Sequence, residues 1–303
     1  MVQFLPIGDT HVVYIDRAPG DDGRGPDGTG EGGTKGGGMP DDGTDPPPVI
    51  FLHGATQSIG VWARQVARIR HRRRCIAYDA RGHGRTRLGP AIASGEATLS
   101  LDLLAADCLA LMDALGIERA VLCGVSMGGM TALHVAARAP ERVSALVLAN
   151  TPMALSLNRH LLRLIDWLNP YAVLPTLLRW VDPARLARIG LRLAGLVFGP
   201  GWAQHGTSRR FEQSFATMDP LAITETYRAI CEARLPELGR VRCPVLVVTG
   251  EGEAGMIFRH AAEIARRVGT AELATIPGGH VTNLDSPHAF NGALARFFQR
   301  WHV

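Results

Sequence analysis

The chain has 303 residues, of which 46% are hydrophobic and 20% are charged, the composition of an ordinary soluble globular protein. That length suits one large domain or two small ones. The sequence contains no run of 18 or more uncharged apolar residues, so it predicts no membrane span. The N-terminus lacks the basic start and long apolar run of a secretory signal. We therefore expect a cytoplasmic protein with no membrane partner.

Positive charge is carried almost entirely by arginine, since Lys35 is the only lysine in a chain of formal net charge +4. The densest basic run covers residues 70–74, between a predicted helix and a predicted strand. No aromatic residues are interleaved with it, so we interpret it as a solvated turn and expect no nucleic-acid partner.

The five cysteines are odd in number and scattered, and four of them lie in apolar runs. This pattern predicts buried free thiols, with neither a disulfide framework nor a metal site. The chain also contains no phosphate-binding loop and no dinucleotide fingerprint, so we expect no cofactor.

The N-terminal part begins with two short β-like segments, around 2–5 and 11–15, which predict an edge hairpin. Residues 18–48 follow and are dominated by Gly, Asp, Pro and Thr. Such a segment cannot bury enough apolar surface to offset the entropy of ordering it. It predicts a flexible surface loop, with a flap that contacts substrate as the alternative.

Beyond residue 48, short apolar runs alternate with helical patterns, which is typical of a parallel sheet covered by helices on both faces. The predicted strands are residues 49–52, 75–78, 120–123, 145–149, 244–249 and 271–276. The predicted helices lie near 60–70, 99–115, 257–267 and 287–301, with one more ending near 139.

Residues 152–236 interrupt this alternation with helical segments that are punctuated by prolines. The chain is therefore predicted to have an α/β core, formed by 1–151 and 237–303, and a helical lid or cap at 152–236. Aromatic and leucine stripes at helical spacing are interpreted mainly as core, with some side chains lining a pocket.

The clearest motif is Gly124-Val125-Ser126-Met127-Gly128, which follows a buried apolar run and precedes a helix of small residues. A serine on such a sharp strand-to-helix turn is strained, and glycines two residues to either side remove side chains that would collide. The turn exposes the Ser126 hydroxyl and places the Met127 N–H at a helix N-terminus, where an anion is favoured. Ser126 is the predicted nucleophile, with a glycine-rich joint that serves packing alone as the alternative unless the rest of the chain supplies a base, an acid and a second oxyanion donor.

A serine hydroxyl needs a base within hydrogen-bond reach, and His280 is the best candidate among the eleven histidines. It follows the last predicted strand in a Gly-Gly loop that can bring the imidazole to Ser126. His53 and His83 lie in tight, glycine-flanked loops, where a backbone or pocket role is favoured. His134 lies two turns down the helix after Ser126 and is expected to point away.

Together these motifs resemble the α/β-hydrolase superfamily over residues 2–300, apart from the Gly-rich loop. The resemblance depends on the order in which they occur at successive strand ends: His53-Gly54, Asp79-x-Arg81-Gly82-His83-Gly84, Gly124-x-Ser126-x-Gly128, Pro244-x-Leu246-x-x-x-Gly250-x-x-Glu253 and Gly279-His280. It implies the α/β-hydrolase fold, with a mostly parallel sheet of eight-stranded type and a helical lid insertion.

The resemblance also implies the remaining members of a catalytic site. The orienting acid falls on Glu253, where aspartate is commoner, and Glu251 is its rival. The end of the preceding strand, which bears the acid in some members, offers only the uncharged Asn150. The residue after His53-Gly54, Ala55, is implied as the second oxyanion donor beside the Met127 N–H.

The leading hypothesis is a serine hydrolase that cleaves a small ester, lactone or activated carbonyl through an acyl-enzyme. The motifs are most similar to the 3-oxoadipate enol-lactonase branch and its esterase relatives, and a small-molecule substrate and a monomer or homodimer are expected. A serine at 126 argues against relatives that use an aspartate nucleophile. The alternatives are a cofactor-free C–C hydrolase or dioxygenase-like enzyme on the same fold, and a non-catalytic ligand-binding receptor.

Overall fold

The computed structural model describes residues 2–19, 45–153, 170–199, 201–202 and 205–303. Most of the predicted Gly-rich loop, residues 20–44, lies outside this part of the chain, so the flexible loop stays a prediction. The same holds for residues 154–169 at the start of the predicted lid.

Within the described residues, eight strands form one sheet in the order β1-β2-β4-β3-β5-β6-β7-β8. Strands β1 and β2 form an antiparallel edge hairpin, β2 runs antiparallel to β4, and every other neighbouring pair is parallel. The strands are β1 (Gln3–Ile7), β2 (Thr10–Arg17), β3 (Val49–Leu52), β4 (Cys75–Tyr78), β5 (Ala120–Val125), β6 (Val143–Ala149), β7 (Val245–Gly250) and β8 (Ala271–Ile276).

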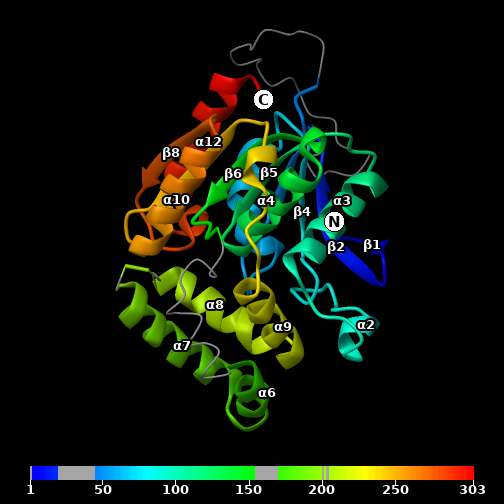
Figure 1. Ribbon diagram of the computed structural model, residues 1–303, viewed down its shortest axis with the longest axis vertical. Coiled ribbons are helices and arrows are strands. Elements are labelled where there is room, and N and C mark those ends of the chain that lie inside the picture. Colours follow the sequence, from blue (N-terminus) through cyan, green and yellow to red (C-terminus); the bar gives the residue numbers. More distant parts are fainter. Residues whose placement is uncertain (1, 20–44, 154–169, 200, 203–204) are drawn as a thin grey trace, which may run out of the picture.

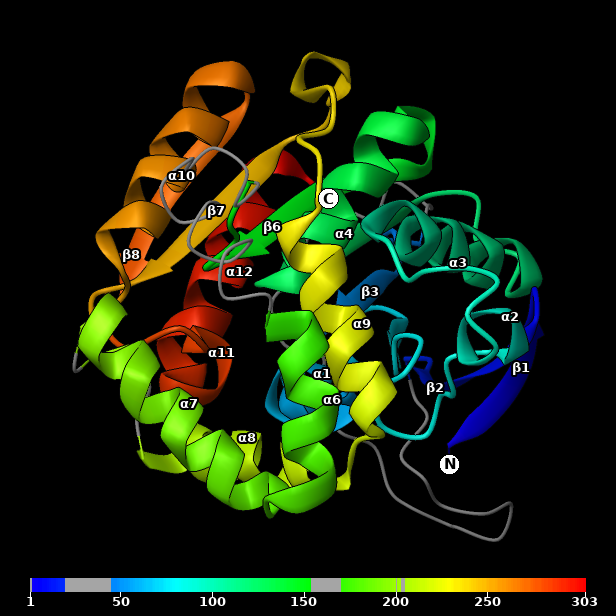
Figure 2. The ribbon, with the colours of Figure 1, turned by 60° about the horizontal axis from the view of Figure 1, so that its bottom comes forward.

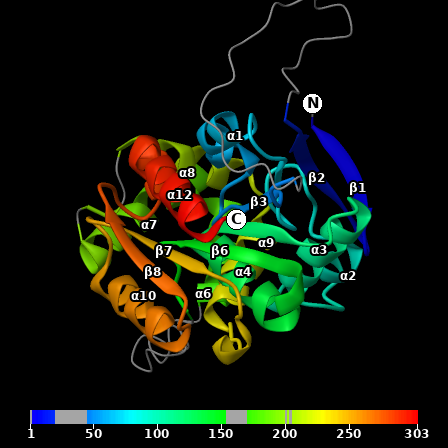
Figure 3. The same ribbon diagram turned by 90° about the horizontal axis from the view of Figure 1, so that it is seen from above.

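Helices cover both faces of the sheet, as Figure 3 shows from above. One face carries α1 (Ala63–Ile69) and α12 (Pro287–Trp301), and the other carries α3 (Leu101–Ala114), α4 (Met127–Arg138) and α10 (Gly255–Arg267). Shorter elements connect them: η1 (Ile59–Trp62), α2 (Pro90–Ala93), η2 (Pro140–Arg142), η4 (Leu238–Arg240) and α11 (Thr282–Asp285).

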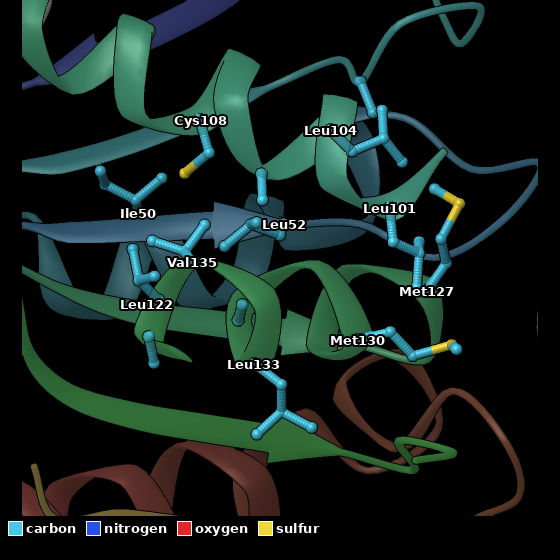
Figure 4. Close-up of a cluster of buried hydrophobic side chains, with 14 of the residues drawn as sticks. Ile50, Leu52, Leu101, Leu104, Cys108, Leu122, Met127, Met130, Leu133 and Val135 are labelled. Atoms are coloured by element: carbon cyan, nitrogen blue, oxygen red, sulfur yellow. The ribbon is translucent and has the colours of Figure 1, made fainter. Parts of the chain in front are cut away.

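The central strands are apolar throughout because both of their faces are buried. In β3, Ile50 and Leu52 join the core beneath α3 and α4, whereas Val49 and Phe51 join the core beneath α1 and α12. This alternation follows from the two-residue period of a strand. Figure 4 shows the first of these cores, where side chains of α3 and α4 meet Ile50 and Leu52.

Four further helices lie at the carboxyl end of the sheet, at the bottom of Figure 1 and toward the viewer in Figure 2. They share a small core of their own that includes Leu178, Phe215 and Ile223. We refer to them as the helical insertion: α6 (Pro170–Trp180), α7 (Pro183–Phe198), α8 (His205–Thr217) and α9 (Pro220–Cys231). Their action as a lid stays a prediction.

Two aspartate-proline pairs begin helices of the insertion. Asp182 accepts a hydrogen bond from the backbone N–H of Arg185, and Asp219 accepts from those of Leu221 and Ala222. In both helices proline occupies the first turn, where its missing N–H has no consequence.

No described helix is both long and apolar enough to cross a bilayer.

Candidate active site

Ser126 stands at the joint between β5 and α4, with a φ of 52° and a ψ of −117°. A Cβ atom on Gly124 would overlap the backbone of Gly128 and Gly129, and one on Gly128 would overlap the carbonyl oxygen of Leu52. The serine N–H donates to the carbonyl of Ala149 in β6 at 2.9 Å. The turn is therefore as sharp as the motif predicts, and only glycine fits on either side of it.

His280 lies between Ser126 and Glu253. Its Nε2 is 2.9 Å from the serine Oγ, and its Nδ1 is 2.7 Å from Glu253 Oε2. A carboxylate can only accept, so Nδ1 carries the hydrogen and the Nε2 lone pair faces the serine hydroxyl. This is the tautomer that a general base requires.

The structure brings Glu253, and not Glu251, to the histidine. The Glu253 side chain is fully buried, and its second oxygen accepts the N–H of Ala254 at 2.8 Å. Glu251 is exposed, although it stands only two residues earlier in the same loop after β7. A buried carboxylate with both oxygens hydrogen-bonded is held in one orientation, which fixes the imidazole plane.

The predicted oxyanion donors lie where two strand ends meet. Met127 is the first residue of α4, so its N–H has no acceptor within the helix. Ala55 follows β3, and the position of a Cβ on the neighbouring Gly54 would be 3.3 Å from the Val125 carbonyl oxygen. The Thr56 hydroxyl donates to the Ala55 carbonyl at 2.7 Å and steadies this loop. The role of both N–H groups stays a prediction.

The three competing histidines, His53, His83 and His134, each have a structural partner, and that of His83 is the Arg81 carbonyl oxygen, 3.0 Å from its Nδ1. His53 donates from Nδ1 to the Gly54 carbonyl at 2.8 Å and accepts the Ala80 N–H at Nε2, at 2.9 Å, so it joins the ends of β3 and β4. Burial lowers the pKa of His53 to about 4. Burial and the neighbouring His53 lower the pKa of His83 to about 3. His134 lies 2.9 Å from Asp102, away from Ser126 as expected.

Sequence reasoning missed one contribution of the helical insertion. Trp202, in the connection between α7 and α8, stacks on the imidazole of His280 with ring centroids 4.9 Å apart. Its carbonyl also accepts the His280 backbone N–H at 2.7 Å. The sequence placed three tryptophans in the predicted lid without a signal for which one faces the site.

Two further contacts connect the insertion with the loops of the site. Thr207, at the start of α8, donates to Asp285, and the other Asp285 oxygen accepts the Gly279 N–H at 2.9 Å. Tyr227 of α9 lies close enough to Thr56 to interact with it, and burial raises the pKa of the Tyr227 phenol to about 12. The loops that carry His280 and Ala55 are thus both held from the insertion.

A family model for the alpha/beta hydrolase fold matches residues 47–287, well over half of the chain. The chain belongs to the alpha/beta hydrolase fold family. This result confirms the resemblance and the fold class predicted from the strand-end motifs, and the chain is an enzyme of the hydrolase class.

Relatives cover most of the chain at modest identity. The 3-oxoadipate enol-lactonase 2 of Acinetobacter baylyi is 27% identical over 85% of this chain and 91% of its own. An uncharacterized carboxylesterase, nap, of Bacillus subtilis is 27% identical over 84% of this chain and 80% of its own. The crystal structure of the enol-lactonase from Burkholderia xenovorans superposes with a TM-score of 0.73 at 22% identity, covering 98% of this chain and all of that one, which shows the shared fold.

In the described part of the chain, no group of three or more His, Cys, Asp or Glu side chains is placed to hold a metal ion. The free cysteines are buried except for the half-buried Cys231, and burial raises the pKa of Cys75 to about 12 and that of Cys123 well above its usual range. A buried thiol with a raised pKa is a poor nucleophile at neutral pH, so these cysteines do not compete with Ser126, whose role as nucleophile stays a prediction.

Proposed function

We propose that the chain is a serine hydrolase that cleaves a small carboxylic ester or lactone through an acyl-enzyme. The observation that carries the proposal is the continuous hydrogen-bonded line from Ser126 Oγ through His280 to Glu253, with distances of 2.9 and 2.7 Å. The relatives named as an enol-lactonase and a carboxylesterase support the substrate class.

In the proposed reaction, Ser126 attacks the carbonyl carbon while His280 Nε2 takes the hydroxyl proton. Glu253 accepts the Nδ1–H and stabilises the imidazolium that forms. The N–H groups of Met127 and Ala55 hold the oxyanion of the tetrahedral intermediate. His280 then protonates the leaving alkoxide, and water activated by the same imidazole hydrolyses the ester to Ser126.

The substrate class is tested with a fluorophosphonate probe and a panel of p-nitrophenyl esters and small lactones. We expect wild type to be labelled and to turn over a short ester or a lactone. Ser126→Ala should lose both properties. Ser94→Ala is the matched control, because Ser94 is an exposed serine whose hydroxyl donates only to the Ala91 carbonyl. This variant should behave as wild type.

Two outcomes contradict the proposal. Labelling that persists in Ser126→Ala would remove Ser126 as the nucleophile. Labelling of Ser126 without turnover of any ester or lactone would contradict the substrate class. The alternative of a C–C hydrolase would then be tested with vinylogous diketones.

A further inference from the structure

Asn150 directly follows β6, in the position where the sequence offered no acid. The residue is completely buried and has a φ of 45°, in the left-handed region. Its backbone N–H donates to the Val248 carbonyl of β7 at 2.8 Å. Asparagine tolerates this backbone region better than other side chains that bear a Cβ, because its short amide can bond locally.

Both ends of the Asn150 amide are used. The Oδ1 accepts the N–H of Gly250 at 2.8 Å. The Nδ2 lies 2.9 Å from the His280 carbonyl oxygen and 3.2 Å from both the Gly279 carbonyl oxygen and the Thr282 Oγ1. An amide has this combination of two donors and an acceptor, whereas a carboxylate of the same shape has acceptors only.

These partners belong to the two loops that supply the base and the acid. Gly250 ends β7, three residues before Glu253, whereas Gly279 and His280 form the loop after β8. The loops are in contact, since a Cβ on Gly250 would overlap the carbonyl oxygens of Gly278 and Gly279. One side chain from a third strand therefore ties both loops together.

We infer that Asn150 is a positioning residue that holds His280 in register with Glu253. The inference rests on the proposed function of the Ser126, His280 and Glu253 line. Within the described residues, no hydrogen bond of Asn150 reaches the imidazole ring or the serine hydroxyl, so Asn150 acts through the backbone that carries the base. A displacement of about 1 Å at a reacting group is enough to lower a rate about 100-fold.

The first test compares Asn150→Ala and Asn150→Asp with a matched buried amide, Gln65→Ala. Gln65 is completely buried and its side-chain amide donates to the Asn283 carbonyl at 3.1 Å, and it forms no hydrogen bond with the described loop at 279–280. We expect both Asn150 variants to lose about 10- to 100-fold in kcat for a short p-nitrophenyl ester, with KM within about twofold. Gln65→Ala should keep kcat within about twofold even if its melting temperature falls.

Asn150→Asp separates hydrogen bonding from shape. The substitution keeps the side-chain volume, but an ionised carboxylate would place an oxygen against the carbonyls of Gly279 and His280. We therefore expect Asn150→Asp to lose at least as much kcat as Asn150→Ala. A role in packing alone predicts the opposite order, with the isosteric variant close to wild type.

A second measurement does not depend on turnover. The His280 Nδ1–H bonded to Glu253 should give a proton resonance far downfield of the amide region, and Glu253→Gln identifies it by removing it. The resonance should broaden or vanish in Asn150→Ala and persist in Gln65→Ala. This measurement decides the inference even if wild type hydrolyses no ester, so failure of the proposed function is distinguishable from failure of the positioning role.

If the Asn150 variants do not fold, Thr282→Val takes their place. It removes one partner of the Asn150 amide from a completely buried site and nearly keeps the shape. We expect a loss in kcat of a few-fold and a weakened downfield resonance. An unchanged resonance together with an unchanged kcat, in whichever of these variants fold, would overturn the inference.

Discussion

At the scale of single residues, the strain at Ser126 is the feature that the sequence exposed most clearly. A non-glycine residue at a φ of 52° and a ψ of −117° costs on the order of 1–3 kcal/mol, which the surrounding structure must offset. Gly124 and Gly128 are the sequence signal of this strained turn, because any side chain at either position would overlap backbone atoms. The sharp turn at Ser126 was therefore predictable from steric grounds, whereas the role of Ser126 as nucleophile stays a prediction.

One pair of variants tests which glutamate, Glu253 or Glu251, orients His280. We expect Glu253→Gln to lower kcat by about 10³- to 10⁴-fold, because an amide at this position stabilises the wrong imidazole tautomer and no imidazolium. Glu251→Gln, two residues earlier and exposed, should stay within about twofold of wild type. Steady-state kinetics with one short ester measures both. A steep loss in Glu251→Gln and a small one in Glu253→Gln would reverse the assignment.

The two buried histidines predict a pH dependence of stability. The folded-state pKa values of His53 and His83 are about 4 and about 3, against an ordinary 6.5. The unfolded chain therefore binds two protons between about pH 6.5 and 4 that the folded chain does not bind. The free energy of unfolding should fall as pH is lowered through this window, with each histidine adding up to about 1.4 kcal/mol per pH unit.

Urea unfolding at a series of pH values measures this slope. His83→Gln removes one of the two protons and should make the slope shallower, whereas the exposed His11→Gln should not change it. Equal slopes in wild type and His83→Gln would show that His83 titrates normally and that burial does not depress its pKa.

At the scale of elements, strands and long helices followed from periodicity. The predicted strands 49–52, 75–78 and 271–276 coincide with β3, β4 and β8, because buried parallel strands are short continuous apolar runs between turn residues. The sequence did not predict α2 and α11, which are four residues each and too short to show a helical period. The helical character of 170–231 was predictable, but the side chains that it turns toward the site were not.

Trp202 shows why the sequence does not predict which side chains of the insertion face the site. Which face of a connection points inward depends on how α7 and α8 pack on the core, and no local pattern encodes it. The role of Asn150 was missed for a different reason, because only the presence of a charged side chain was considered at that position. Hydrogen-bonding capacity at a strand end was the signal that could have identified it.

The stacking of Trp202 on His280 yields a prediction about the insertion. An aromatic pair of this kind contributes about 0.5–1.5 kcal/mol, which corresponds to a loss of about 2- to 13-fold in kcat for Trp202→Ala. Trp202→Phe keeps a stacking ring and should retain most of the activity, since the carbonyl bond to His280 N–H survives both changes. Trp180→Ala, an 85% exposed tryptophan of the same insertion, is the control. Equal kcat values for Trp202→Ala and Trp180→Ala would contradict a role for the stack.

At the scale of the whole molecule, the sheet explains how residues from 53 to 282 reach one site. The loops after β3, β5, β6, β7 and β8 leave the same edge because these strands are parallel, so their chemistry converges whatever their distance in sequence. The order of motifs at strand ends therefore predicted the candidate site, although the distances within it and its contacts with the insertion depend on tertiary packing that the motifs do not encode.

One charged network connects parts of the fold outside the site. Arg81, in the loop after β4, is 2% exposed and binds the buried Asp107 of α3 with two hydrogen bonds of 2.9 and 2.8 Å. It also pairs with Asp9, in the turn of the β1–β2 hairpin, and donates to the Leu88 carbonyl at 3.0 Å. The guanidinium of Arg81 thus connects the edge hairpin, α3 and the 79–89 loop through hydrogen bonds and ion pairs.

A double-variant cycle measures what this network contributes to stability. Arg81→Met leaves the Asp107 carboxylate buried and unpaired, so we expect the free energy of unfolding to fall by about 3–5 kcal/mol. Adding Asp107→Leu removes the stranded charge and should restore a large part of that loss, because an apolar pair of similar volume avoids the desolvation of both ions. Urea unfolding of the two single variants and the double variant gives the coupling. Losses that simply add would mean that the two side chains stabilise the fold independently, and that the hairpin and α3 are held by their apolar contacts rather than through Arg81.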